Sequence, residues 1–536
     1  MNDDDASILF NLADKRYTRR DVIKGAVAAG AAVSLGPIIL AACGGQSSSA
    51  ASPSAVASPR RGGVLHAGLT GGSSSDTLDA LNGITNVDEA RAANLYEPLM
   101  GFRADGSLEP VLAEEMTSNA DATIWTIRLK SGITWHNGKD FTADDVMYTF
   151  RRICNPKSPG EGASSLALLN LASMRKLDAH TLQVPCTAPF SAFPQSVASL
   201  QYVYIVPEGY DPTHPIGTGP FELVSFTPGQ QSTFKRNPNY WQSGLPYLDE
   251  VIITDYADAT SQVNALLGGQ VQVVNLLEAD VMSEVTSQGK KILVSPGAGW
   301  TPFTMRVDSA PFNDVRVRQA MRLIVDREQM LALLFSGHGT IGNDIFSPAD
   351  PAYDRQIPQR EQDIEQAKSL LKAAGREGLR IELVTADIAQ GTIAAAQVFA
   401  QQAQAAGVTV NLNKTTVTNF YGTNYLKWVF AQDFWYFEYY LPQVANCTLS
   451  TSPFNETHFN NPRYASLHLE ALRTVDDSKR AEICHEMQMI DYNEGGYIIP
   501  FFPPVIDGYA PNIQGLLPSK AGVSLNNYQF KYLSLS

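Results

Sequence analysis

The stretch from Asp433 to Cys447 contains the residues best suited to bind a small molecule. Six aromatic side chains fall between Phe434 and Tyr440 around a single acid, Glu438. An ionised carboxylate among apolar groups is costly unless a cation pairs with it. Glu438 therefore reaches solvent, meets a distant Arg or Lys of the protein, or receives a cation from a ligand.

The short motifs that would indicate an enzyme are each incomplete. Ser369 to Lys372 has the spacing of the serine-lysine pair of penicillin-binding enzymes, but its order relative to Lys130 to Gly132 is wrong. His485 has methionine where a second zinc-binding histidine would stand, and Gly217 to Gly219 lacks the third glycine of a dinucleotide loop. We therefore predict no catalytic residue, no metal and no cofactor. An exported hydrolase of peptides or esters stays as the alternative function.

The beginning of the chain has the features of an export signal. Arg19 and Arg20 precede an apolar run rich in Ala and Gly, which ends at Leu40-Ala41-Ala42-Cys43. This order resembles a twin-arginine signal followed by a lipobox, which predicts a signal peptide over residues 1–42 and a lipid on the Cys43 thiol. A membrane helix that stays attached is the alternative. Residues 43–60 are poor in large apolar groups and should form a flexible tether.

Size and charge limit the function of the remaining chain. About 475 residues follow the tether, more than one hydrophobic core usually serves, so we expect at least two domains. The net charge of −14 argues against nucleic acid or an anionic membrane surface as a partner. The lipid anchor, rather than charge, is expected to hold the protein at a membrane.

Four cysteines remain when Cys43 carries a lipid, and their state is open. Disulfides form outside the cytoplasm, and nearness in sequence suggests Cys154 with Cys186 and Cys447 with Cys484, although four cysteines allow three pairings. Buried free thiols are the alternative. The spacing of these cysteines does not match a metal site.

Hydrophobic periodicity predicts alternating strands and helices, which places the chain in the α/β class. Thr142 is the expected N-cap of one helix. The predicted helices are Phe141–Ile153, Val315–Leu334, Asp363–Ala374, Thr392–Ala406 and Ser478–Asn493; the predicted strands are one that starts at Ile124, Glu250–Tyr256, Arg380–Thr385 and Val408–Lys414.

Several blocks of the chain resemble one known family. They are "LEPVLAEEMTSNADATIWTIRLKSGITWHNGKDFTADDVMYTFRRI", "PIGTGPFELVSF", "FKRNPNYWQSGLPYLDEVII" and "APFNDVRVRQAMRLIVDREQM". In this order they are similar to the signature blocks of the extracytoplasmic solute-binding proteins of peptide-type ABC transporters, family 5, which includes oligopeptide-, dipeptide- and nickel-binding proteins. The resemblance extends from Gly62 to the C-terminus.

The resemblance implies a two-lobed periplasmic-binding-protein-like fold of class II type, with an additional inserted domain and a ligand cleft between the lobes. The first lobe would comprise residues 61–94, 215–299 and 500–536. The inserted domain would comprise residues 95–214, and the other lobe residues 300–499.

Two parts of the family blocks invite a structural interpretation. Gly217 and Gly219 precede Pro220, as a hinge where the chain crosses between lobes would need, although a tight turn would use the same residues. Arg316 and Arg318 are expected on the outer face of a long helix, solvated or paired.

The resemblance also locates the ligand site. In peptide-binding relatives the aromatic block reads W-x-x-D-Y-x-D-P, and its first acid meets the amino group of the peptide. Trp435, Glu438, Tyr439 and Pro442 match this pattern, whereas Leu441 replaces the second acid. This replacement argues against a standard dipeptide or oligopeptide.

Three more residues are candidates for contact with the ligand. Tyr436 lies within the aromatic block, and Trp300 is an aromatic residue from another part of the chain. Arg306 stands where relatives tend to have asparagine, and it either faces an anionic group of the ligand or forms a structural ion pair.

The implied function is that of a lipid-anchored, monomeric solute-binding component of an ABC importer. It would capture a peptide or a related small solute and deliver it to a membrane permease, without a cofactor and without chemistry. Amine-bearing solutes, sugars and metal chelates are the further ligand classes.

Overall fold

The computed structural model of the chain describes residues 59–83, 85–198 and 202–536. The predicted signal peptide, with Arg19 and Arg20, the lipidation site Cys43 and nearly all of the tether lie outside the described residues. Within those residues, no helix combines the length and the apolar composition needed to span a bilayer.

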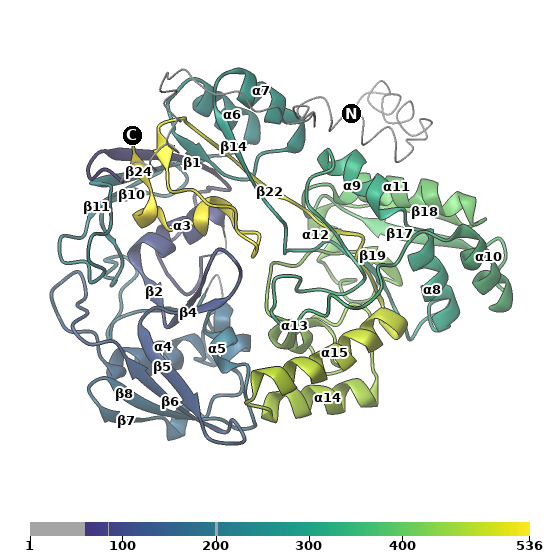
Figure 1. The fold of residues 1–536 in the computed structure, drawn as a ribbon, viewed down its shortest axis with the longest axis horizontal. Helices are drawn as coiled ribbons and strands as arrows, with labels where there is room; N and C mark the ends of the chain where they lie inside the picture. The colour runs from purple at the N-terminus through teal and green to yellow at the C-terminus, as the bar shows by residue number, and fades with distance from the viewer. Residues whose placement is uncertain (1–58, 84, 199–201) are drawn as a thin grey trace, which may run out of the picture. The chain divides into compact units, whose positions relative to one another are not determined.

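The largest sheet has seven strands in the order β10-β11-β12-β1-β13-β22-β14. Its centre is parallel, since β1 pairs with β12 and β13 in the same direction, and the other pairings are antiparallel. Figure 1 shows the C-terminal β22 beside strands from much earlier in the chain. The strands are β1 (Val64–Thr70), β10 (Phe221–Thr227), β11 (Gln231–Arg236), β12 (Glu250–Tyr256), β13 (Val273–Val274), β14 (Lys291–Ser295) and β22 (Val505–Tyr509).

A second sheet has five strands in the order β18-β17-β19-β15-β20. Its strands are β15 (Phe303–Met305), β17 (Arg380–Thr385), β18 (Thr409–Lys414), β19 (Phe430–Gln432) and β20 (Tyr497–Ile498). Four helices lie beside this sheet (Figure 1). They are α8 (Val315–Ile324), α9 (Arg327–Phe335), α10 (Ile364–Ala373) and α11 (Thr392–Ala405). Phe303, Met321 and Phe399 belong to the core between this sheet and the helices.

A third, antiparallel sheet has four strands in the order β5-β6-β8-β7. In β6, Trp125, Ile127 and Leu129 are buried at alternate positions, as the period of a strand requires. Helix α4 (Ala143–Ile153) follows with Thr142 as its N-cap, where the Asp145 carboxylate accepts the Thr142 N–H at 2.8 Å. The strands are β5 (Ala113–Ser118), β6 (Ile124–Leu129), β7 (Arg175–Asp178) and β8 (Thr181–Pro185).

The remaining elements are shorter or stand outside these sheets. Helices α14 (Pro462–Arg473) and α15 (Asp477–Glu494) lie side by side (Figure 1). The others are α3 (Asn86–Leu95), α5 (Phe193–Ser196), α6 (Ala259–Leu267), α7 (Met282–Ser287), α12 (Val417–Phe420), α13 (Tyr440–Cys447), β2 (Glu97–Pro98), β3 (Met100–Phe102), β4 (Leu108–Pro110), β9 (Tyr204–Ile205), β16 (Thr340–Ile341), β21 (Phe501–Phe502), β23 (Ile513–Gln514) and β24 (Ser534–Leu535).

One predicted helix is wrong in its extent. The range Val315–Leu334 contains two helices, α8 and α9, because the chain leaves the helical conformation at Val325, whose ψ is 114°. Asp326 then caps the second helix, since its carboxylate accepts the Gln329 N–H at 2.9 Å. In the sequence, Asp326 is the residue that indicates a new helix start, but the apolar periodicity continues across it and so hid the break.

The chain passes between the seven-stranded and five-stranded sheets twice. Residues 296–302 form the first crossing, from β14 to β15, and residues 499–504 form the second, from β20 to β22. The two crossings touch at Gly297, where a Cβ would lie 1.6 Å from the Pro503 carbonyl oxygen. Glycine is therefore required by the close approach of two backbones.

Gly217 and Gly219 do not lie at either crossing. They precede β10, where the chain returns to the seven-stranded sheet after the segment that contains the four-stranded sheet. A Cβ at Gly217 would lie 1.6 Å from the Leu95 carbonyl oxygen, so close backbone packing explains the glycine. The hinge role that the sequence suggests for these two glycines stays a prediction.

The four cysteines that the structure describes are free thiols rather than the suggested disulfides. Burial raises the pKa of Cys154 to about 11 and the pKa of both Cys186 and Cys484 to about 12. Burial also raises the pKa of Cys447. Of the two alternatives, the structure has the free thiols, with Cys447 and Cys484 buried and Cys154 and Cys186 half-buried.

Candidate functional site

A cavity of about 470 Å³ lies at the two crossings. The first crossing contributes Gly299, Trp300 and Thr301 to its wall, and the second contributes Pro503 and Pro504. Segments next to each of the three large sheets contribute to the wall, so parts of the chain that are distant in sequence meet at the cavity. Segments next to the seven-stranded sheet supply Asn86, Glu89, Leu276, residues 521–524 and Tyr528. Segments next to the four-stranded sheet supply Glu161, Ser164, Ser165 and Tyr202. Segments next to the five-stranded sheet supply Ala389, Gln390, residues 434–438 and Phe454.

Trp300 and Trp435, both predicted from the sequence, meet in this wall. Each donates its backbone N–H to the carbonyl of the other, at 2.9 and 2.8 Å. Their rings stack with centroids 5.9 Å apart, and Phe346 stacks on Trp300 at 5.2 Å. This stack joins the first crossing to the aromatic block and gives the cavity a rigid apolar side.

Glu438 lines the cavity, and among the described residues its carboxylate has no internal cation. The Asn446 side-chain amide donates to it at 2.8 Å. In the part of the chain that the structure describes, no Lys or Arg forms an ion pair with Glu438. The residue is partly buried, and burial of its carboxyl group raises its pKa. Of the three alternatives for Glu438, pairing with a distant Arg or Lys is therefore not what the structure shows.

The charge around the cavity has one sign. Glu89, Glu161 and Glu438 line it, whereas no Lys, Arg or His is among the described residues of its wall. Nearby, the Glu278 carboxylate accepts a hydrogen bond from Gln390, a residue of the wall. Burial raises the pKa of Glu278 as well. This arrangement favours a cationic group, since opposite charges attract more strongly where water is partly excluded.

A comparison with protein families identifies the family of the chain. The model of the family described as "Bacterial extracellular solute-binding proteins, family 5 Middle" matches residues 107–455. The chain belongs to this family. The resemblance found in the sequence blocks is thereby confirmed.

Individual relatives show how far the similarity extends. The glutathione-binding protein GsiB of Salmonella typhimurium is 25% identical over 476 residues, which cover 83% of this chain and 90% of that protein. The substrate-binding protein CtaP of Listeria monocytogenes superposes with a TM-score of 0.78 at 20% identity, over 89% of this chain and 100% of CtaP. DppA of Helicobacter pylori, solved with the peptide STSA, has a TM-score of 0.73 at 19% identity, over 89% of this chain and 98% of DppA. The predicted two-lobed α/β fold is confirmed.

Two predicted site residues of this solute-binding protein do not line the cavity. Tyr439 donates its hydroxyl to the Gly106 carbonyl at 2.7 Å and packs against Phe102. Arg306 donates to both carboxylate oxygens of Asp308, at 3.0 and 2.8 Å. By contrast, Tyr436 lines the cavity and is 56% exposed, so its ring is available for contact.

Sequence reasoning missed a buried carboxyl pair behind Trp435. The Trp435 indole N–H donates to Glu456 at 3.1 Å, and the Tyr497 hydroxyl also donates to Glu456. Tyr421 donates to Asp433 at 2.7 Å. Burial and the adjacent Asp433 raise the pKa of Glu456 well above its ordinary range. Its nearest signal in the sequence is Asp433, at the start of the aromatic block.

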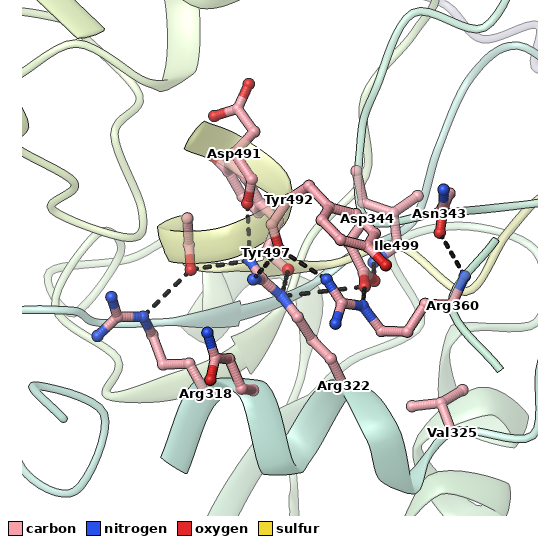
Figure 2. A network of polar contacts seen from close by, with 12 residues as sticks. Arg318, Arg322, Val325, Asn343, Asp344, Arg360, Asp491, Tyr492, Tyr497 and Ile499 are labelled. Carbon is pink, nitrogen blue, oxygen red and sulfur yellow. Dashed lines mark hydrogen bonds and ion pairs between the residues drawn. The ribbon is translucent and has the colours of Figure 1, made fainter. Parts of the chain in front are cut away.

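A network of buried arginines holds the segment that leads into the second crossing (Figure 2). Arg322 donates to the carbonyls of Tyr492, Gly495 and Tyr497 at 2.8 to 2.9 Å. Arg318 donates to the Glu494 carbonyl at 2.6 Å. These guanidinium groups satisfy carbonyls at the C-terminal end of α15, where the helix dipole favours a cation.

The expected outer-face position of two arginines is therefore right for one and wrong for the other. Arg316 is exposed and pairs with Asp314 at 2.6 Å. Arg318 is buried, because the end of α15 packs against this face of α8.

The incomplete enzyme motifs do not come together. Ser369 and Lys372 are exposed on α10, and neither lines the cavity. Glu486, beside His485, forms an ion pair with Arg463 at 2.8 Å. Across residues 59–83, 85–198 and 202–536, no group of three or more His, Cys, Asp or Glu is arranged to hold a metal ion.

Proposed function

We propose that the chain is the lipid-anchored solute-binding component of an ABC importer, which captures a peptide or a related small solute in the cavity and delivers it to a membrane permease. The observation that carries the proposal is the Glu438 carboxylate, which lines an aromatic cavity with Asn446 as its hydrogen-bond donor. A ligand ammonium group is the partner that this carboxylate suits. GsiB, named for glutathione, and DppA, solved with a peptide, support a peptide-like class.

We also propose the division into lobes that the family implies. The seven-stranded sheet takes its strands from residues 61–94, 215–299 and 500–536, the four-stranded sheet from 95–214, and the five-stranded sheet from 300–499. This separation supports two lobes and an inserted domain. Ligand contacts made only in the closed form would shift the equilibrium from open to closed. The protein would act as a monomer, with the permease as its partner, and without nucleic acid or a cofactor.

The binding function is tested by thermal shift against a library of peptides and amine-bearing solutes. A ligand that binds only the folded protein raises the unfolding free energy by about 2.7 kcal/mol at a hundredfold excess over Kd. Mass spectrometry of the recovered hits should find them chemically unchanged. Conversion of a hit into a product would overturn the proposal in favour of a hydrolase.

The anchor is tested separately in bacterial cells. Cys43→Ser should abolish lipidation and release a soluble protein, because the thiol carries the lipid. Replacement of Arg19 and Arg20 by Lys should block export by the twin-arginine pathway. A Cys43→Ser protein that stays uncleaved in the membrane would mean that the N-terminal segment is a membrane helix.

A further inference from the structure

A second cavity, of about 540 Å³, lies beside the first. Residues 164–168 and 188–196 form one side of it, and residues from α13 to α14 form the other. Its wall is mostly apolar and includes Leu168, Phe190 and Leu472. Arg473, exposed at the end of α14, is its one Lys, Arg, Asp or Glu among the described residues. This cavity therefore suits an apolar group.

The two cavities share part of their walls. Ser164 and Ser165 line both of them. Asn446 lines the second cavity and donates at 2.8 Å to Glu438, which lines the first. A molecule that meets Glu438 is thus separated from the second cavity by one hydrogen-bonded pair of side chains.

The second cavity also contains a polar atom without a partner. His468 lines it and is only 5% exposed, and its Nε2 has no hydrogen-bond partner. Burial lowers the pKa of His468 to about 4, so the imidazole is neutral near pH 7. One ring nitrogen of a neutral imidazole donates and the other accepts, so a hydroxyl group, which can do both, can pair with Nε2 in either tautomer. A buried polar atom left unpaired costs free energy, which a ligand hydroxyl would recover.

We propose that the second cavity binds the apolar end of the same ligand whose ammonium group meets Glu438. This end carries a hydroxyl group that hydrogen-bonds His468. The ligand is therefore an amphipathic primary amine with a substantial apolar part. The inference rests on the proposed function, since it takes Glu438 as the site of the ammonium group.

Alkylammonium ions of increasing length are the probes for this inference. Calorimetry should give an affinity that rises about fourfold for each buried CH₂ group, so n-octylammonium, with four more such groups, should bind roughly 250-fold more tightly than n-butylammonium. Ala445 lines the second cavity from an exposed position on α13, so Ala445→Phe can fill the cavity without disturbing the core. This variant should lose most of the increase in affinity with alkyl chain length and keep its affinity for n-butylammonium.

A matched control comes from a third cavity, of about 400 Å³, whose wall includes Ala352 and has no residue in common with the first cavity. Ala352→Phe adds the same side chain there and should leave the gain with length unchanged. Equal losses in the two variants would overturn the inference.

The role of His468 is tested with linear amino alcohols. At the chain length that brings the hydroxyl to Nε2, the amino alcohol should bind about twofold to tenfold more tightly than the alkylammonium ion of equal carbon number. His468→Leu should remove this difference and retain the gain with alkyl length. If no chain length shows the difference, the hydroxyl group is excluded from the ligand class.

The outcomes separate the inference from the function on which it rests. If Glu438→Gln weakens every amine but the wild type binds both alkylammonium ions equally, the second cavity is not a ligand site and the proposed function stands. If no amine binds the wild type, or Glu438→Gln leaves all affinities unchanged, the ammonium site fails and the inference fails with it.

Discussion

Asp344 and Glu438 are two carboxylates in contrasting surroundings. Asp344 is buried and accepts hydrogen bonds from Arg327 and Arg360, each at 2.8 Å (Figure 2 shows Asp344 and Arg360). Burial raises the pKa of Asp344, but these arginines and Arg322 outweigh it and hold the pKa below its ordinary value. Burial also raises the pKa of Glu438, and only the Asn446 amide opposes it.

The difference shows which charge belongs to the framework and which to the site. Around Asp344, arginines of the protein complete the ion pairing. Asp344 also fixes the second crossing, because it accepts the Ile499 N–H at 3.0 Å. At Glu438 the pairing is incomplete and the residue lines a cavity. A partly buried carboxylate without a cationic partner lowers stability, and such residues are expected where a protein binds a ligand.

The largest effect should follow from breaking the framework pair. Asp344→Asn leaves the guanidinium groups of Arg327 and Arg360 buried without their counterion, which should lower the unfolding free energy by about 3 to 5 kcal/mol. Urea denaturation measures the loss. Asp308→Asn is the control, because an ion pair with solvent access is worth at most about 1 kcal/mol. Equal losses in the two variants would contradict the contrast between framework and surface.

The next effect concerns ligand affinity rather than stability. Glu438→Gln keeps the shape of the side chain and removes its charge, so affinity for a primary amine should fall tenfold to a hundredfold, since a hydrogen bond to a charged group is worth about 1.5 to 3 kcal/mol. The N-acetylated form of the same ligand should bind the wild type poorly and respond much less. Calorimetry on the four combinations measures this.

The unliganded Glu438→Gln protein provides the control for that experiment. Its unfolding free energy should stay within about 0.5 kcal/mol of the wild type or rise, because no internal ion pair is broken. A large loss of stability, with equal weakening toward both ligand forms, would show a structural role for Glu438.

The two carboxylates should respond to pH with opposite sign. Since burial raises the pKa of Glu438 above its ordinary value of 4.5, its contribution to stability falls as pH rises through the window above that value. Over the same window the ionised fraction increases, so affinity for an ammonium group should rise. Calorimetry at several pH values should find this rise in the wild type and not in Glu438→Gln.

Asp344 supplies the opposite slope. Its pKa is held below 3.8, so the stability that it contributes is present above this value and is lost as pH falls through its lower, folded-state pKa. Acid denaturation curves should therefore flatten at low pH in Asp344→Asn. An unchanged acid limb would show that other groups control acid unfolding.

The smallest effect is expected at Arg306. Because this side chain pairs with Asp308 away from the cavity, Arg306→Gln should change ligand affinity by less than about twofold and the unfolding free energy by less than about 1 kcal/mol. Calorimetry and urea denaturation measure the two quantities. A large loss of affinity restricted to anionic ligands would restore the role in ligand binding that the sequence suggests.

Regular elements were the part of the fold most open to prediction. The strands Glu250–Tyr256 and Arg380–Thr385 agree with β12 and β17 at both ends, because alternation of apolar and polar residues is a local pattern. The break at Val325 was missed, since the apolar spacing continues across it and only the cap at Asp326 interrupts the helix.

The candidate site was predictable in part. Glu438, Trp435 and Tyr436 are close together in sequence, so the aromatic block reveals them, and the resemblance added Trp300. Glu456 and His468 carry no such local signal, because they meet the site only through folding.

The sequence by itself determined the family, the α/β class and the position of an acid among aromatic residues, since each is written in the order of neighbouring side chains. Only the tertiary structure decided which charges are paired. Arg318 and Arg322 lie on one helix with carbonyls from α15 beside them, whereas Glu438 has Asn446 and a cavity. The physical reason is that the free energy of a charge depends on burial and on partners within a few ångströms, and contacts between distant segments of the chain set both.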